Sequence, residues 1–169
     1  TLFPDYIKSK GINKKMFRHC VWFLIKENHG INKNIVSYAS LLNTPTFNGH
    51  VTIQSGLSRE EAEEVCERFR EAPKPFFSPH GYPKISKTKF QNAYRTRELD
   101  FYAIEQPLNT NGIYVDEIHV SLAYSINRPI TQMELAMAPY TERIYDTDID
   151  VVVANCRSEN PSYWYVEDF

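Results

Sequence analysis

The sequence predicts an α+β fold made largely of antiparallel strands. Strand-like and helix-like segments mix along the chain and are joined by hairpin-like connections, which indicates the α+β class. One strand–turn–helix unit occurs twice. The length of 169 residues suits one domain, or one domain of two lobes. We therefore expect residues 1–169 to form a single domain, with residues 1–16 as a lysine-rich arm on its surface.

The first half of the chain shows two strand and two helix patterns. Residues 17–26 are rich in aromatic and apolar side chains and read as a strand, and residues 47–54 as a second one. Residues 32–42 space their apolar side chains for burial on one side of a helix. In the charged segment 58–70, an inner apolar stripe predicts another helix; the stripe consists of Ala62, Val65, Cys66 and Phe69.

The second half is mostly strand. A proline-rich loop at 72–83 and a basic segment at 84–97 precede it. A tight turn is expected at 109–112, where Asn and Gly cluster, and a short helix at 131–138. The predicted strands of this half are 99–105, 113–124, 149–155 and 163–166.

Composition narrows the range of partners. The formal net charge is −2, whereas a long nucleic acid normally requires a basic surface. Aromatic residues make up 14% of the chain, which suits a core and also a platform for stacking bases. No stretch is long and apolar enough to span a membrane, and the first residues do not resemble a signal peptide. The widely spaced Cys20, Cys66 and Cys156 read as reduced thiols, so we expect a cytoplasmic protein.

Two tetrapeptides carry the strongest functional signal. His50-Val51-Thr52-Ile53 and His119-Val120-Ser121-Leu122 both read His, apolar, hydroxyl, apolar. Side chains two apart on a strand share a face, so each histidine lies beside a hydroxyl. Two imidazoles can take and give a proton while two hydroxyls hydrogen-bond the oxygens of a phosphate. This set of side chains suits the cleavage of a phosphodiester without a metal.

Each motif is followed by a turn and a capped helix. Ser58 with Glu61, and Thr131 with Glu134, have the spacing of a capping box. The repetition of the whole unit makes a chance match much less plausible than a single H-x-[ST]-x would be.

The repeated unit resembles the 2H phosphoesterase superfamily, which is named for two such motifs. The resemblance implies a bilobal fold in which two pseudo-symmetric lobes of antiparallel sheet flank a central cleft, and activity that needs no metal or other cofactor. Within the superfamily, the chain is most similar to the type 1 phage anti-CBASS cyclic-oligonucleotide nucleases. That branch degrades cyclic di- and trinucleotide messengers, such as 3′3′-cGAMP, in the host bacterial cytoplasm.

Two other functions stay open. Segments 20–24 and 119–124 are also similar to cyclic phosphodiesterases that act on ADP-ribose 1″,2″-cyclic phosphate, and RNA 2′,3′-cyclic ends are related substrates. A binding module that captures cyclic nucleotides without cleaving them is the third possibility. In all three cases the partner is a small cyclic nucleotide, and the sequence indicates no obligate protein partner.

The candidate catalytic residues are His50, Thr52, His119 and Ser121, with either histidine as the base and either a ribose 2′-hydroxyl or water as the nucleophile. Candidate substrate-binding residues are Tyr124, Trp22 and Trp164. His19, His29 and His80 have no hydroxyl residue two positions later and are expected to be structural or surface residues. The sequence contains no H-E-x-x-H, D-x-D or paired-cysteine motif, so no metal site is predicted.

Overall fold

The computed structural model describes residues 17–91 and 98–167, and the predicted arm at 1–16 lies outside them. So do residues 92–97 of the predicted basic segment. The elements in chain order are β1 (Arg18–Ile25), α2 (Gly30–Leu42), β2 (His50–Leu57), α3 (Arg59–Glu71), β3 (Phe77–Pro79), β4 (Lys84–Gln91), β5 (Glu98–Thr110), β6 (Ile113–Ile126), α4 (Gln132–Ala136), β7 (Ile149–Cys156) and β8 (Tyr165–Glu167).

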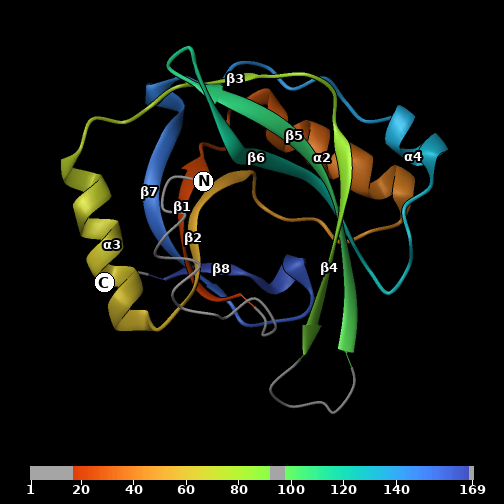
Figure 1. The fold of residues 1–169 in the computed structure, drawn as a ribbon, viewed down its shortest axis with the longest axis horizontal. Helices are drawn as coiled ribbons and strands as arrows, with labels where there is room; N and C mark the ends of the chain where they lie inside the picture. Colours follow the sequence, from red (N-terminus) through yellow and green to blue (C-terminus); the bar gives the residue numbers. More distant parts are fainter. Residues whose placement is uncertain (1–16, 92–97, 168–169) are drawn as a thin grey trace.

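The described strands form one sheet of eight strands, all of whose pairings are antiparallel. Their order is β3-β5-β6-β2-β1-β7-β8, and β4 pairs with the remaining length of the β5 edge. With the three α-helices of the described residues, this confirms the predicted α+β class. Figure 1 shows α3 beside β7 and α2 behind the β5–β6 pair.

The two faces of the sheet bury different side chains. One face carries aliphatic residues such as Val21, Val51 and Val120, and packs against α2 and α3 to form the main core. The opposite face carries a second, aromatic cluster that includes Trp22, Phe101 and Trp164. This separation follows from the alternation of side chains along each strand.

Both predicted capping boxes are confirmed. The Ser58 hydroxyl accepts a hydrogen bond from the Glu61 N–H, and the Glu61 carboxylate accepts one from the Ser58 N–H. Thr131 and Glu134 make the same exchange at the start of α4. Each box satisfies two helix-terminal groups that would otherwise lack partners, and so sets where the helix begins.

The structure differs from the predicted elements in several places, and the largest difference is the strand β4 in the basic segment, where no strand was predicted. α2 begins at Gly30, two residues early, because the His29 side chain caps it by accepting from the Ile31 N–H. The proline-rich loop contains the short strand β3, whose fully buried Phe77 exchanges backbone hydrogen bonds with Ile144. β5 continues past the predicted end, because Pro107 lies beside an irregularity in the pairing with β6, where a ladder tolerates proline.

No helix among the described residues is both long and apolar enough to cross a lipid bilayer.

Replacing Ser58 with alanine removes the N-cap of α3, and we expect the free energy of unfolding to fall by about 1 kcal/mol. Urea unfolding of both proteins gives the difference. Ser37→Ala is the matched control, because Ser37 is exposed inside α2 and caps nothing. That variant should stay within about 0.5 kcal/mol of wild type. Equal losses in the two variants would contradict a specific role of the cap.

Candidate active site

The two H-x-[ST]-x motifs lie side by side on neighbouring antiparallel strands. Val51 of β2 is the register partner of Val120 of β6. Because the strands run in opposite directions about this pair, His50 falls opposite Ser121, and Thr52 falls opposite His119. The two motifs are therefore related by a local twofold axis that passes between the valines.

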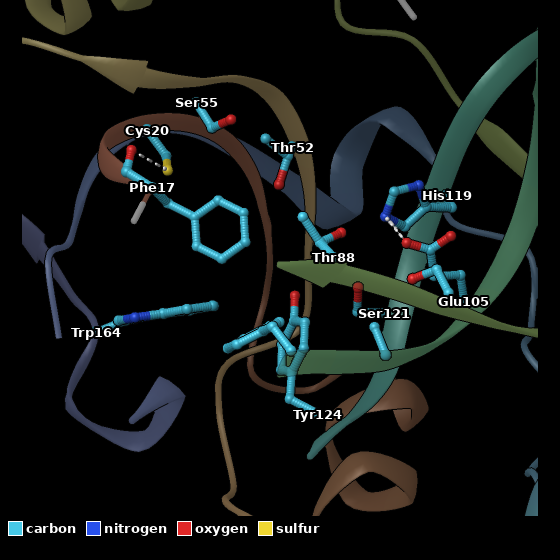
Figure 2. A pocket seen from close by; sticks show the side chains of 13 residues that line it. Phe17, Cys20, Thr52, Ser55, Thr88, Glu105, His119, Ser121, Tyr124 and Trp164 are labelled. Atoms are coloured by element: carbon cyan, nitrogen blue, oxygen red, sulfur yellow. Dashed lines mark hydrogen bonds and ion pairs between the residues drawn. The ribbon is translucent and has the colours of Figure 1, made fainter. Parts of the chain in front are cut away.

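All four polar side chains belong to the same face of this strand pair. Val51 and Val120 are almost completely buried in the main core, so the residues on either side of them turn to the opposite face. Three of the four, Thr52, His119 and Ser121, line a cavity there, as Figure 2 shows. The fourth, His50, is 4% exposed and is not among the residues that line the cavity.

His50 is held by two contacts. Its Nδ1 lies 2.7 Å from the carbonyl oxygen of Asn48, and its ring stacks on Trp22 with 3.8 Å between ring centres and 14° between planes. A carbonyl oxygen only accepts, so Nδ1 carries the hydrogen, and a neutral ring then has its lone pair on Nε2.

The pKa of His50 is lowered from 6.5 to about 4, chiefly by burial; the Asn48 hydrogen bond opposes this change, and the nearby His119 adds to it. The face of Trp22 attracts a cation by about 0.5–2 kcal/mol. The lowering of the His50 pKa corresponds to about 3 kcal/mol, which is more than this attraction. The loss of hydration on burial therefore determines the direction in which the pKa moves. His50 is therefore neutral at pH 7.

His119 makes the same backbone contact but has a different second partner. Its Nδ1 lies 2.9 Å from the Glu117 carbonyl oxygen, and its Nε2 lies 3.1 Å from Oε2 of Glu105 on β5. Glu117 has a φ of 72°, which is unfavourable for a residue with a side chain, and lies in the irregular part of the β5–β6 pairing. This local distortion accompanies the hydrogen bond between the Glu117 carbonyl and the His119 ring.

The cavity has a polar side and an aromatic side, and its volume is about 180 Å³. Tyr124 and Trp164, two of the candidate substrate-binding residues, are among the residues that line it, and each is at most 8% exposed. Burial raises the pKa of Tyr124 above its usual range, against the smaller effect of the nearby Ser121 hydroxyl. Phe17 stands nearly perpendicular to Trp164 and to Phe101, 5.5 Å from the centre of each ring.

Trp22 is the exception among the predicted substrate-binding residues. It is 2% exposed, it does not line the cavity, and its ring is covered by His50. The alternation of side chains along β1 places Trp22 on the face of the sheet that carries the cavity. There the His50 ring of the neighbouring strand β2 stacks on it. Trp22 was expected to contact the substrate, but in the structure it contacts the ring of His50 and supports it instead.

The other histidines lie outside the residues that line the cavity. His29 caps α2 and also contacts the Arg143 carbonyl, and His19 pairs with Glu167 of β8. His80 is exposed. On β4, side chains alternate between cavity and solvent, so Lys87 and Lys89 are exposed.

Sequence reasoning missed several residues of the cavity wall. Glu105 was only the end of a predicted strand, although a carboxylate inside an apolar stretch is itself a signal of a specific partner. The other missed residues lie on strands, or in one case just before β1, and the pairing partners of these strands are distant in sequence; the residues are Phe17, Cys20, Ser55, Ser86, Thr88, Phe101 and Ala103.

In the described parts of the chain, no three His, Cys, Asp or Glu side chains are grouped so that they could hold a metal ion. Comparisons with protein-family models, with curated proteins and with solved structures give no match.

The burial of His50 predicts a pH dependence of stability. Between pH 6.5 and about 4, His50 binds a proton in the unfolded chain but not in the folded protein. Proton uptake therefore favours unfolding, so the free energy of unfolding falls as the pH is lowered through this range, by about 3 kcal/mol from this residue. Urea unfolding between pH 4 and 7 should show a shallower decline for His50→Asn than for wild type.

Ser37→Ala is the control for this measurement, because it replaces an exposed side chain that has no titratable group, and its decline should match that of wild type. Parallel curves for wild type and His50→Asn would contradict the buried neutral state of His50.

Proposed function

We propose that the protein is a metal-independent phosphodiesterase that hydrolyses the 3′–5′ bonds of cyclic di- and trinucleotide messengers such as 3′3′-cGAMP. The observation that carries this proposal is the antiparallel register of Val51 and Val120, which brings both H-x-[ST]-x motifs to one face. In this proposal a phage uses the enzyme in the bacterial cytoplasm to evade CBASS immunity, as the resemblance implies.

The same register supports a bilobal 2H-type architecture. In this interpretation the pairing of β2 with β6 forms the boundary between the two lobes. One lobe comprises β2, β1, β7 and β8, and the other comprises β6, β5, β4 and β3, following the order of the sheet.

The different surroundings of the histidines support different roles. His50 is neutral at pH 7 and has its lone pair on Nε2, so it can accept a proton as the general base, and the burial that lowers its pKa also makes it a weaker base than a free histidine. His119 has hydrogen-bond acceptors near both ring nitrogens, which suits the general acid. Thr52 and Ser121 are the hydroxyls that hydrogen-bond the non-bridging oxygens as negative charge accumulates on them.

In the proposed reaction, His50 takes the proton of a ribose 2′-hydroxyl. The oxygen attacks phosphorus as the bond to the 5′-oxygen breaks, and His119 gives a proton to that leaving oxygen. The product is a linear nucleotide with a 2′,3′-cyclic phosphate, which water then opens with the two histidines in exchanged roles.

The size and charge of the cavity favour one phosphodiester at a time. Its volume of about 180 Å³ is below the usual range for sites that enclose a whole drug-sized ligand. None of the described residues that line it is Lys or Arg. We infer that one phosphate and the ribose attached to it enter, beside the aromatic side of the cavity that includes Trp164, while the bases and the rest of the ring stay outside.

The small volume also favours the second candidate function. ADP-ribose 1″,2″-cyclic phosphate and RNA 2′,3′-cyclic ends present a single cyclic phosphate, and the same four residues would open it. A substrate panel with the purified protein separates the two activities by their relative kcat/KM.

We expect the protein to linearise 3′3′-cGAMP in excess EDTA, because the proposed chemistry uses only side chains. Replacing His50 or His119 with alanine should lower kcat by about 10²–10⁴-fold, the usual contribution of a general acid or base. Chromatography of the products measures both effects.

His80→Ala, which removes an exposed histidine, serves as the control and should keep full activity. Loss of activity in EDTA would overturn the metal-independent mechanism. Tight binding of the dinucleotide without turnover by wild type would favour the non-catalytic binding module.

The nucleophile is tested with a cyclic dinucleotide in which both nucleotides are 2′-deoxy. We expect binding without cleavage, because the attacking oxygen is missing at both linkages. Cleavage at the normal rate would show that water attacks directly. The matched ligand with deoxyribose at only one nucleotide should still be cleaved at its intact linkage.

A further inference from the structure

Glu105 is the one carboxylate among the described residues that line the cavity. It lies on β5, where it is the register partner of Ser121, and its side chain is 16% exposed. Figure 2 shows it on the same side of the cavity as His119, with the ion pair drawn between them. Neither motif includes it, and it contacts the nitrogen through which His119 would act.

The hydrogen bonds of His119 determine how many protons its ring carries. Nδ1 faces a carbonyl oxygen at 2.9 Å and Nε2 faces a carboxylate oxygen at 3.1 Å. A neutral imidazole has one N–H, so it can satisfy only one of these acceptors. Both contacts are satisfied when the ring is an imidazolium and Glu105 is ionised.

No other charged group of the described cavity competes for this pair. His50 on β2 is neutral at pH 7, and Tyr124 on β6 keeps its proton because burial raises its pKa. The side chains that β4 contributes to the cavity are the hydroxyls of Ser86 and Thr88. The described lining contains neither Lys nor Arg.

We propose that Glu105 is a positioning residue that keeps His119 doubly protonated and oriented toward the cavity, and that it thereby assigns the acid role to the second motif. The consequence for catalysis rests on the proposed function, whereas the effect on the protonation of His119 does not.

Glu105 acts in the step in which the leaving group departs. As the 2′-oxygen–phosphorus bond forms, the phosphorus–5′-oxygen bond breaks and its electron pair stays on the 5′-oxygen. That oxygen takes the Nε2 proton of His119, which leaves its hydrogen bond with Glu105 in the transfer, while His50 holds the proton removed from the 2′-hydroxyl. When water opens the cyclic phosphate, His119 takes the water proton and His50 returns its proton to the 2′-oxygen, so both histidines regain their first states.

The test begins with nitrogen-15 NMR of the histidine side chains in the free protein at pH 7, where a His119→Ala spectrum assigns the His119 signals. Wild type should show His119 with both ring nitrogens protonated. In Glu105→Gln the size of the side chain is kept and its charge is lost, so the signals should move toward those of the neutral ring. Glu117→Gln is the matched control, since it removes an exposed carboxylate two residues from His119 and should leave the signals unchanged.

The second measurement compares two leaving groups. Glu105→Gln should lower kcat on 3′3′-cGAMP by about 10–100-fold, less than removal of the acid itself. Adenosine 3′-(4-nitrophenyl phosphate) releases a stable phenolate that needs no proton, so the variant should cleave it nearly as fast as wild type. His50→Ala should lose activity on both compounds, because the attacking hydroxyl is the same.

The NMR result tests the role of Glu105 whether or not the protein cleaves either compound. If wild type cleaves neither compound, the proposed function is wrong, and the inference about Glu105 still depends on the NMR result alone. Unchanged His119 signals in Glu105→Gln would overturn the inference about Glu105. So would equal losses on the two leaving groups, since general damage to the cavity affects both.

Discussion

The antiparallel pairing of Val51 with Val120 is the constraint on which the candidate site depends. Side chains alternate along a strand, so a register slip of one residue on either strand would turn a histidine and its hydroxyl into the core. Both valines are buried in the main core, and a slip would replace one of them there with a polar side chain. Burying such a group without a partner is unfavourable, so the core opposes the slip. The same contacts that stabilise the sheet therefore hold the polar set together.

Two similar motifs acquire different chemistry from their neighbours. Each histidine donates its Nδ1 hydrogen to the carbonyl of the residue two positions earlier, so the local geometry is repeated. The difference arises across strands, where Trp22 of β1 covers His50 and Glu105 of β5 faces His119. An apolar ring favours the neutral imidazole and a carboxylate favours the charged one. This asymmetry suits a reaction that needs a base and an acid at the same time.

Local signals allowed much of the fold to be predicted. The capping boxes at Ser58 and Thr131 depend only on residues three apart, and the structure contains both. Signals that depend on distant partners were harder to interpret. Phe77 becomes part of a strand because Ile144 pairs with it, and Pro107 stays within β5 because the pairing with β6 is irregular there. Neither partner is close in sequence, so local composition could not indicate the outcome.

The sequence by itself determined which residues share a face within each motif, because the period of a strand is a local property of the backbone. It also placed Tyr124 and Trp164 among the candidates that the structure finds in the cavity wall. Only the tertiary structure decided that the motifs are neighbours, that Trp22 supports His50, and that Glu105 pairs with His119. These contacts join residues of different strands, and strand order arises from the burial of the whole sheet.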